Sequence, residues 1–133
     1  MRAEDDPQVE QVPLTEPRPL SEEQRRLLEH LARAPLGKPG LRAQIEAAQV
    51  VAECSCGCPS VGLEVDQSVP SVSFDPAETP DGRTDHVALT ARRSGTELPE
   101  VTLHLIHGRL FELEVWAGYG IRPGIDIRSL KYA

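Results

Sequence analysis

The spacing of apolar residues changes once along this chain, and that change limits the folds open to it. Between residues 21 and 49, leucine, isoleucine and alanine recur every three or four positions, as they do on one face of a helix. From Val50 onward, apolar and polar residues alternate, which is the pattern of a half-buried strand. Two helices followed by a run of strands predict helices packed against an antiparallel sheet.

The two helices precede the change of period. Ser21-Glu-Glu-Gln24 is a capping box, in which the Ser21 hydroxyl accepts from the Gln24 amide and the Gln24 side chain bonds back to Ser21. The first helix therefore begins after Ser21, and it ends before Pro35 because proline cannot continue the hydrogen-bond ladder. Apolar residues at helical spacing predict a second, shorter helix over residues 41–48.

Five strands are expected after the helices, over residues 50–56, 61–65, 86–93, 101–107 and 110–116. A long loop, residues 67–84, separates the second strand from the third. In the last hairpin, a three-residue loop that pairs Leu105 with Leu113 keeps the apolar residues on one face. The apolar residues expected to share one core are Leu28, Leu31, Ile45, Val61, Leu63, Val87, Leu89, Leu103, Leu105, Leu113 and Val115. The predicted fold class is α+β: an antiparallel sheet of about five strands with the two N-terminal helices packed on one face.

The first 19 residues differ in composition from the rest, because four prolines stand among acidic residues. Such a segment buries too little apolar surface to offset its ordering entropy, so we expect a disordered acidic arm over 1–19 and a single α+β domain over 20–133. The formal charge of the whole chain is −7. Because a basic surface is missing, we expect binding neither to nucleic acid nor to a membrane.

The start of the chain, Met-Arg-Ala-Glu-Asp-Asp-Pro, lacks the apolar stretch of a secretory signal. No apolar run approaches the roughly 20 residues that a membrane span needs. The expected location is therefore cytoplasmic, where thiols stay reduced.

All three cysteines lie within five positions. Thiolates bind zinc and carry redox chemistry, so Cys54, Cys56 and Cys58 are a candidate metal or thiol site. The C-x-C-x-C spacing departs from the paired C-x2-C of common zinc sites, and the local sequence places no fourth ligand. In the competing interpretation, Cys54 and Cys56 pack as small apolar residues that continue the strand face of Val50 and Ala52. The sequence favours packing, with zinc as the possible cofactor of the alternative.

The only tryptophan, Trp116, falls on the outer strand face with Glu112 and Glu114. With Tyr119 it forms a candidate protein-binding patch, because Trp and Tyr are enriched at binding hot spots. In the alternative, the C-terminal segment folds back over Trp116. His104 falls on the same outer face, where the expected register places Glu114 opposite it as an exposed pair without a catalytic role.

The motifs of a nucleophile elbow, a zinc-protease helix and a phosphate loop do not occur, so the sequence gives little support for an enzyme. We expect a non-catalytic protein–protein interaction domain of adaptor or toxin-neutralising type, with another protein as its partner. The alternative is a metal-binding or thiol-active domain centred on the cysteines. Convergence of the three sulfur atoms would separate the two.

Four segments resemble a group of small bacterial proteins common in actinobacteria: Leu41-Arg-Ala-Gln44, Ala48-Gln-Val-Val51, Cys56-Gly-Cys-Pro-Ser-Val61 and Gly108-Arg-Leu-Phe-Glu-Leu-Glu-Val115. The likeness covers roughly residues 25–116 and leaves out the arm. The Cys-Gly-Cys-Pro turn is its most distinctive part. The group carries no assigned activity, so the resemblance implies domain boundaries and no mechanism.

Overall fold

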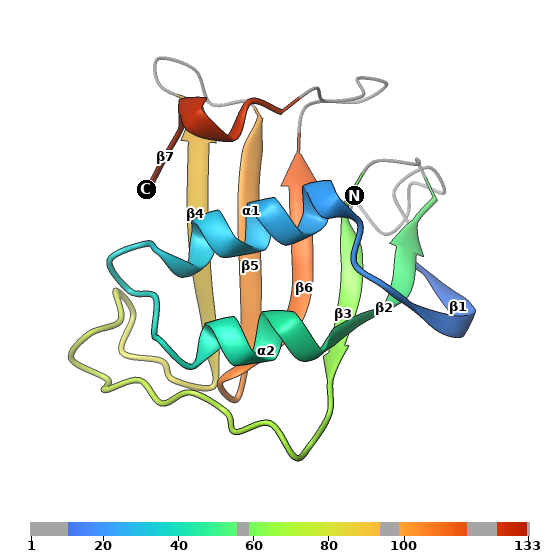
Figure 1. The fold of residues 1–133 in the computed structure, drawn as a ribbon. Coiled ribbons are helices and arrows are strands. Elements are labelled where there is room, and N and C mark those ends of the chain that lie inside the picture. The colour runs from blue at the N-terminus through green and yellow to red at the C-terminus, as the bar shows by residue number, and fades with distance from the viewer. Residues whose placement is uncertain (1–10, 56–58, 94–98, 117–124, 133) are drawn as a thin grey trace, which may run out of the picture.

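A single antiparallel sheet dominates the computed structural model, which describes residues 11–55, 59–93, 99–116 and 125–132 (Figure 1). The strands are β1 (Gln11–Pro19), β2 (Ala48–Cys54), β3 (Val61–Val65), β4 (His86–Arg93), β5 (Glu100–Ile106), β6 (Arg109–Trp116) and β7 (Leu130–Tyr132). They lie in the order β1-β2-β3-β6-β5-β4-β7, so β6 is the central strand. The helices are α1 (Glu22–Ala32) and α2 (Leu41–Ala47), with a 3₁₀ turn, η2, at Ile127–Ser129.

The predicted fold class is wrong, because the sheet has seven strands rather than about five and the helices are not N-terminal. β1 precedes them and occupies residues 11–19, which we expected to belong to a disordered arm. Composition misleads here because an edge strand is held by backbone hydrogen bonds and needs little apolar surface. Its prolines are tolerated where the missing N–H would face away from the neighbouring strand.

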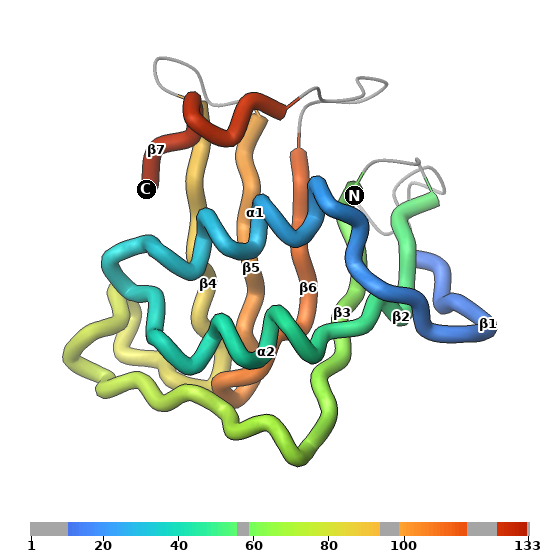
Figure 2. Tube along the Cα trace, in the orientation of Figure 1, coloured from blue at the N-terminus to red at the C-terminus, as the bar shows by residue number. Residues whose placement is uncertain are grey.

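Both helices cross the same side of the sheet, one beside the other (Figures 1 and 2). α1 packs against β4 and β5, and α2 against β3 and β6. The predicted capping box is confirmed: Ser21 Oγ accepts from Gln24 N at 3.1 Å, and Gln24 Oε1 accepts from Ser21 N at 2.9 Å. Within the described part of the chain, neither helix has the length and apolar content needed to span a membrane.

Buried aliphatic side chains fill the space between the helices and the sheet, and every residue of the expected core set is among them. One polar residue, Gln44, is fully buried with them. Its amide nitrogen donates to Gly108 O at 2.9 Å, and its Oε1 accepts from Leu110 N at 2.9 Å. Gln44 therefore satisfies its own polar atoms while it ties α2 to the turn between β5 and β6.

That turn consists of two residues, His107 and Gly108, both with positive φ (50° and 75°). This is the geometry of a two-residue hairpin turn, and a β-carbon on Gly108 would collide with the backbone of Val72. The three-residue loop expected from the sequence is wrong, because Leu105 pairs with Leu110 and not with Leu113.

The additional residue lies inside β6 as a bulge at Phe111. Beyond the bulge, His104 stands opposite Glu112, and Leu103 stands opposite Leu113. The apolar residues therefore still meet on the helix-covered side, although through a different pairing from the expected one.

Candidate functional site

The side of the sheet opposite α1 and α2 is here called the open face. Its centre is formed by side chains of three neighbouring strands that alternate with the core residues along each strand, and all of them except the buried Thr102 are at least partly exposed. They are His86 and Thr90 on β4, Thr102 and His104 on β5, and Glu112, Glu114 and Trp116 on β6. Phe111, the extra residue of the bulge, is exposed next to Glu112.

A chain of hydrogen bonds links three of these side chains across three strands. His86 Nε2 lies 3.0 Å from His104 Nδ1, and His104 Nε2 lies 2.8 Å from Glu114 Oε1. The contact between His104 and Glu114 was expected, but it forms diagonally, since Glu112 is the residue directly opposite His104. His86 was not anticipated, because its approach to His104 depends on the pairing of β4 with β5.

The hydrogen-bonded side chains of His86, His104 and Glu114 do not form a metal-binding site. The two nitrogens of the His104 ring point in opposite directions, one toward His86 and the other toward Glu114. In residues 11–55, 59–93, 99–116 and 125–132, no group of three His, Cys, Asp or Glu side chains could hold a metal ion.

The pKa values of this cluster shift in directions set by these contacts. The hydrogen bond to Glu114 raises the pKa of His104, and the same bond lowers the pKa of Glu114. Glu112 differs from both, because burial raises its pKa above the usual value. Among the described residues it accepts no hydrogen bond and forms no ion pair, so its charge is only weakly compensated, by the nearby imidazoles.

The neighbours of Glu112 away from His104 are small. Gly62 of β3 stands directly opposite it, and Ala52 of β2 stands opposite Gly62. A β-carbon built on Gly62 would lie 3.1 Å from Ala52 Cβ and 3.6 Å from Gln11 Oε1. On this side the Glu112 carboxylate therefore has only a glycine and an alanine as cross-strand neighbours, with the Gln11 amide close to Gly62.

Of the three cysteines in the candidate metal or thiol site, Cys54 is described and is half-buried at the end of β2. Cys56 and Cys58 lie outside the described residues. A bulge at Val51 reverses the alternation of β2, so that Val50 is buried under the helices while Ala52 pairs with Gly62 on the open face. The expectation that Cys54 continues the buried face of Val50 is therefore wrong.

The residues that follow the cysteines are held firmly. Gln24 Nε2 donates to Pro59 O at 3.3 Å, which ties this end of the turn to α1. The buried Ser60 Oγ accepts from Val115 N at 2.7 Å and donates to Val115 O at 3.1 Å. Cys54 N in turn donates to Ser60 O at 3.3 Å, and Ser60 bonds to the residue before Trp116, so Cys54 and Trp116 lie at the same end of the sheet.

Trp116 itself is 37% exposed and stands opposite Glu100 on β5. Tyr119, its expected companion, lies outside the described residues.

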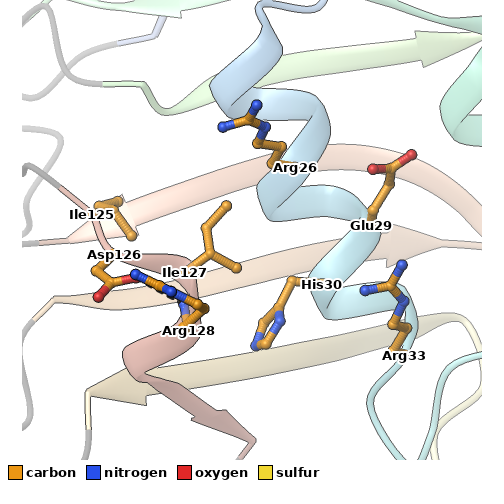
Figure 3. Close-up of a pocket in the computed structure, with 8 residues that line it drawn as sticks. All are labelled: Arg26, Glu29, His30, Arg33, Ile125, Asp126, Ile127 and Arg128. Carbon is orange, nitrogen blue, oxygen red and sulfur yellow. Dashed lines mark hydrogen bonds and ion pairs between the residues drawn. The ribbon is translucent and has the colours of Figure 1, made fainter.

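A cleft of about 460 Å³ lies between α1 and the C-terminal segment (Figure 3). Its lining residues are Arg26, Glu29, His30, Arg33, Ile125, Asp126, Ile127 and Arg128. Arg26 and Arg128 already face acids: Arg26 lies 2.6 Å from Glu22, and Arg128 lies 3.5 Å from Asp126. The sequence does not predict this cleft, because its two walls, on α1 and on the C-terminal segment, lie about 100 positions apart in the chain.

Comparisons of this chain with protein-family models, with curated proteins and with solved structures find no match. The fold and the open face define a protein built on a seven-stranded antiparallel sheet with helices on one side. Its function has to be inferred from the chemistry of its surfaces.

Proposed function

We propose that the protein is a cytosolic, non-catalytic interaction domain that binds another protein through its open face, as an adaptor or a toxin-neutralising protein does. The supporting observation is the exposure of two aromatic side chains on the central strand: Phe111 is 54% exposed and Trp116 is 37% exposed. Large aromatic side chains at a surface provide much of the binding energy at protein interfaces.

The polar residues around these aromatics fit a recognition surface. His86, His104 and Glu114 bond to one another and form an ordered patch between the aromatic positions. Thr90 Oγ1 and Thr102 Oγ1 lie 3.0 Å apart and order the neighbouring strands in the same way. A surface that is already ordered loses little side-chain entropy when a partner binds.

A photo-crosslinking amino acid placed at Phe111 tests the proposal. In cells that express the protein naturally, we expect the crosslinker at Phe111 to capture a partner. The same crosslinker at Glu23, an exposed residue of α1, should not capture this partner. The partner is then identified, purified and titrated against the Trp116→Ala and Phe111→Ala variants, after thermal unfolding has shown that both fold. We expect binding at least about ten-fold weaker in one of them. Unchanged affinity in both variants would refute the proposal.

The metal or thiol function remains a second proposal, supported by the position of Cys54, which is half-buried and does not continue the buried face of Val50. Its test is elemental analysis of protein purified without chelator. Near-stoichiometric zinc that disappears in Cys54→Ser would favour this function, and zinc-free protein with freely reactive thiols would exclude the metal.

A further inference from the structure

We infer that the partner is a basic protein segment that places a lysine or arginine side chain against Glu112, beside an apolar side chain that packs on Phe111 or Trp116. This inference rests on the proposed function, because it concerns the same open face. It goes further by naming the chemistry of the partner and the residue that receives it.

The first support is the charge of the central strand. Glu112 and Glu114 occupy successive outward positions of β6, so two carboxylates share one small area. Glu114 is engaged by His104, whereas Glu112 is half-buried and accepts no hydrogen bond from the described residues. A half-buried carboxylate without such a partner gains more from a matching cation than an exposed one does.

The second support is the small size of the neighbouring residues. Gly62 and Ala52 are the cross-strand neighbours of Glu112 on the side that faces β3 and β2. The aliphatic stem of a lysine or arginine can lie on these two residues while its charged end reaches Glu112. Gln11 Oε1 lies 3.6 Å from the position that a β-carbon on Gly62 would occupy, and it provides a second acceptor for the same cation.

The third support is the combination of aromatic and acidic residues on one strand. Phe111 precedes Glu112 directly, and a cation over an aromatic ring is attracted to its face. Two basic residues of this face, Arg92 on β4 and Lys131 opposite it on β7, lie two and three strands away from Glu112. Arg92 also lies 3.7 Å from Glu100. The overall charge of −7 also attracts a basic partner over longer range and repels an acidic one.

The test uses the full chain labelled with nitrogen-15 and three synthetic peptides of equal length that contain leucine and tryptophan. One peptide also carries arginine and lysine, one carries glutamate and one carries serine. We expect the basic peptide to shift the amide signals of β6 and of Gly62, and the other two to leave them unchanged. Dissociation constants of the basic peptide are then measured for the Glu112→Gln variant and for a matched control, Glu46→Gln, which changes an exposed glutamate of α2.

The expected result is binding about five-fold weaker in Glu112→Gln and unchanged in Glu46→Gln. Equal weakening in both variants shows a general charge effect, and binding of the serine or glutamate peptide at equal strength shows no preference for cations. Either result overturns the inference.

The natural partner, once captured, separates the two proposals. If its affinity depends on Trp116 but not on Glu112, only the basic contact is rejected. If its affinity depends on neither Phe111 nor Trp116, the proposed function itself is rejected.

Discussion

The ion pair between His104 and Glu114 makes stability depend on pH. The raised pKa of His104 stabilises the folded state fully below about 6.5, and this contribution is lost as the pH rises through the raised value. The lowered pKa of Glu114 stabilises the folded state above about 4.5, and this contribution is lost as the pH falls through the lowered value. The pair is therefore most stabilising between these two limits.

Glu114→Gln should remove this contribution. We expect it to lower the free energy of unfolding by about 0.2–1 kcal/mol near pH 5.5 and by less near pH 8, a small effect because the Glu114 side chain is largely exposed. Urea unfolding of both proteins at the two pH values measures the difference. Glu46→Gln serves as the control and should show no such pH dependence; an equal loss at both pH values for Glu114→Gln would mean that the ion pair contributes nothing.

Among the structural elements, β1 differs most from its expected role, because it is an edge strand of the sheet and not part of a disordered arm. It pairs with β2 at both of its ends, and Arg18 lies 2.6 Å from Glu53. Its three prolines and its charges blunt the outer edge of the sheet, where unpaired backbone groups would otherwise invite another chain to pair.

Deletion of residues 1–19 should therefore destabilise the protein rather than leave it unchanged. We expect the melting temperature to fall by several degrees and the protein to self-associate, because β2 then becomes an unprotected edge. Thermal unfolding and light scattering measure the two effects. A melting temperature within about 2 °C of the full chain, with the protein still monomeric, would return residues 1–19 to the role of a dispensable arm.

Local signals allow the elements to be predicted better than their pairing. The capping box at Ser21 and the alternation in β4 to β6 depend on neighbours in sequence, so those elements are predicted close to their observed bounds. The bulges at Val51 and Phe111 each insert one residue without altering composition. The predicted face of Cys54 fails at the first bulge, and the predicted pairing of the last hairpin fails at the second. The site shows the same division: Glu112, Glu114 and Trp116 follow from alternation, whereas His86 joins the cluster only through tertiary pairing.

At the scale of the whole molecule, the sheet has one face packed against helices and one that bears the proposed partner surface. Leu113 and Phe111 belong to the same strand but face these two environments: Leu113 is fully buried, and Phe111 is exposed. Substitutions at these two residues therefore compare how much each face of the sheet contributes to the free energy of unfolding.

Leu113→Ala should cost about 2–5 kcal/mol, because it removes buried methyl groups and leaves a cavity. Phe111→Ala should change the free energy of unfolding by about 0.5 kcal/mol or less, as exposed substitutions usually do. Urea unfolding of the two variants supplies the comparison. Similar losses would show that Phe111 is packed in solution and is not available to a partner.

The tight turn at His107 and Gly108 also has a consequence for the order in which the chain folds. β4, β5 and β6 follow one another in sequence, whereas β3 must find β6 across about 50 intervening residues, and pairing over such distances is slow. Val72 N donates to Gly108 O, and we expect this contact of the long connection from β3 to form after the turn has closed. We expect Leu103→Ala in β5 to slow refolding, and Val61→Ala in β3 mainly to accelerate unfolding, in stopped-flow measurements. The strand that bears Glu112 would then be in place before either edge of the sheet is complete.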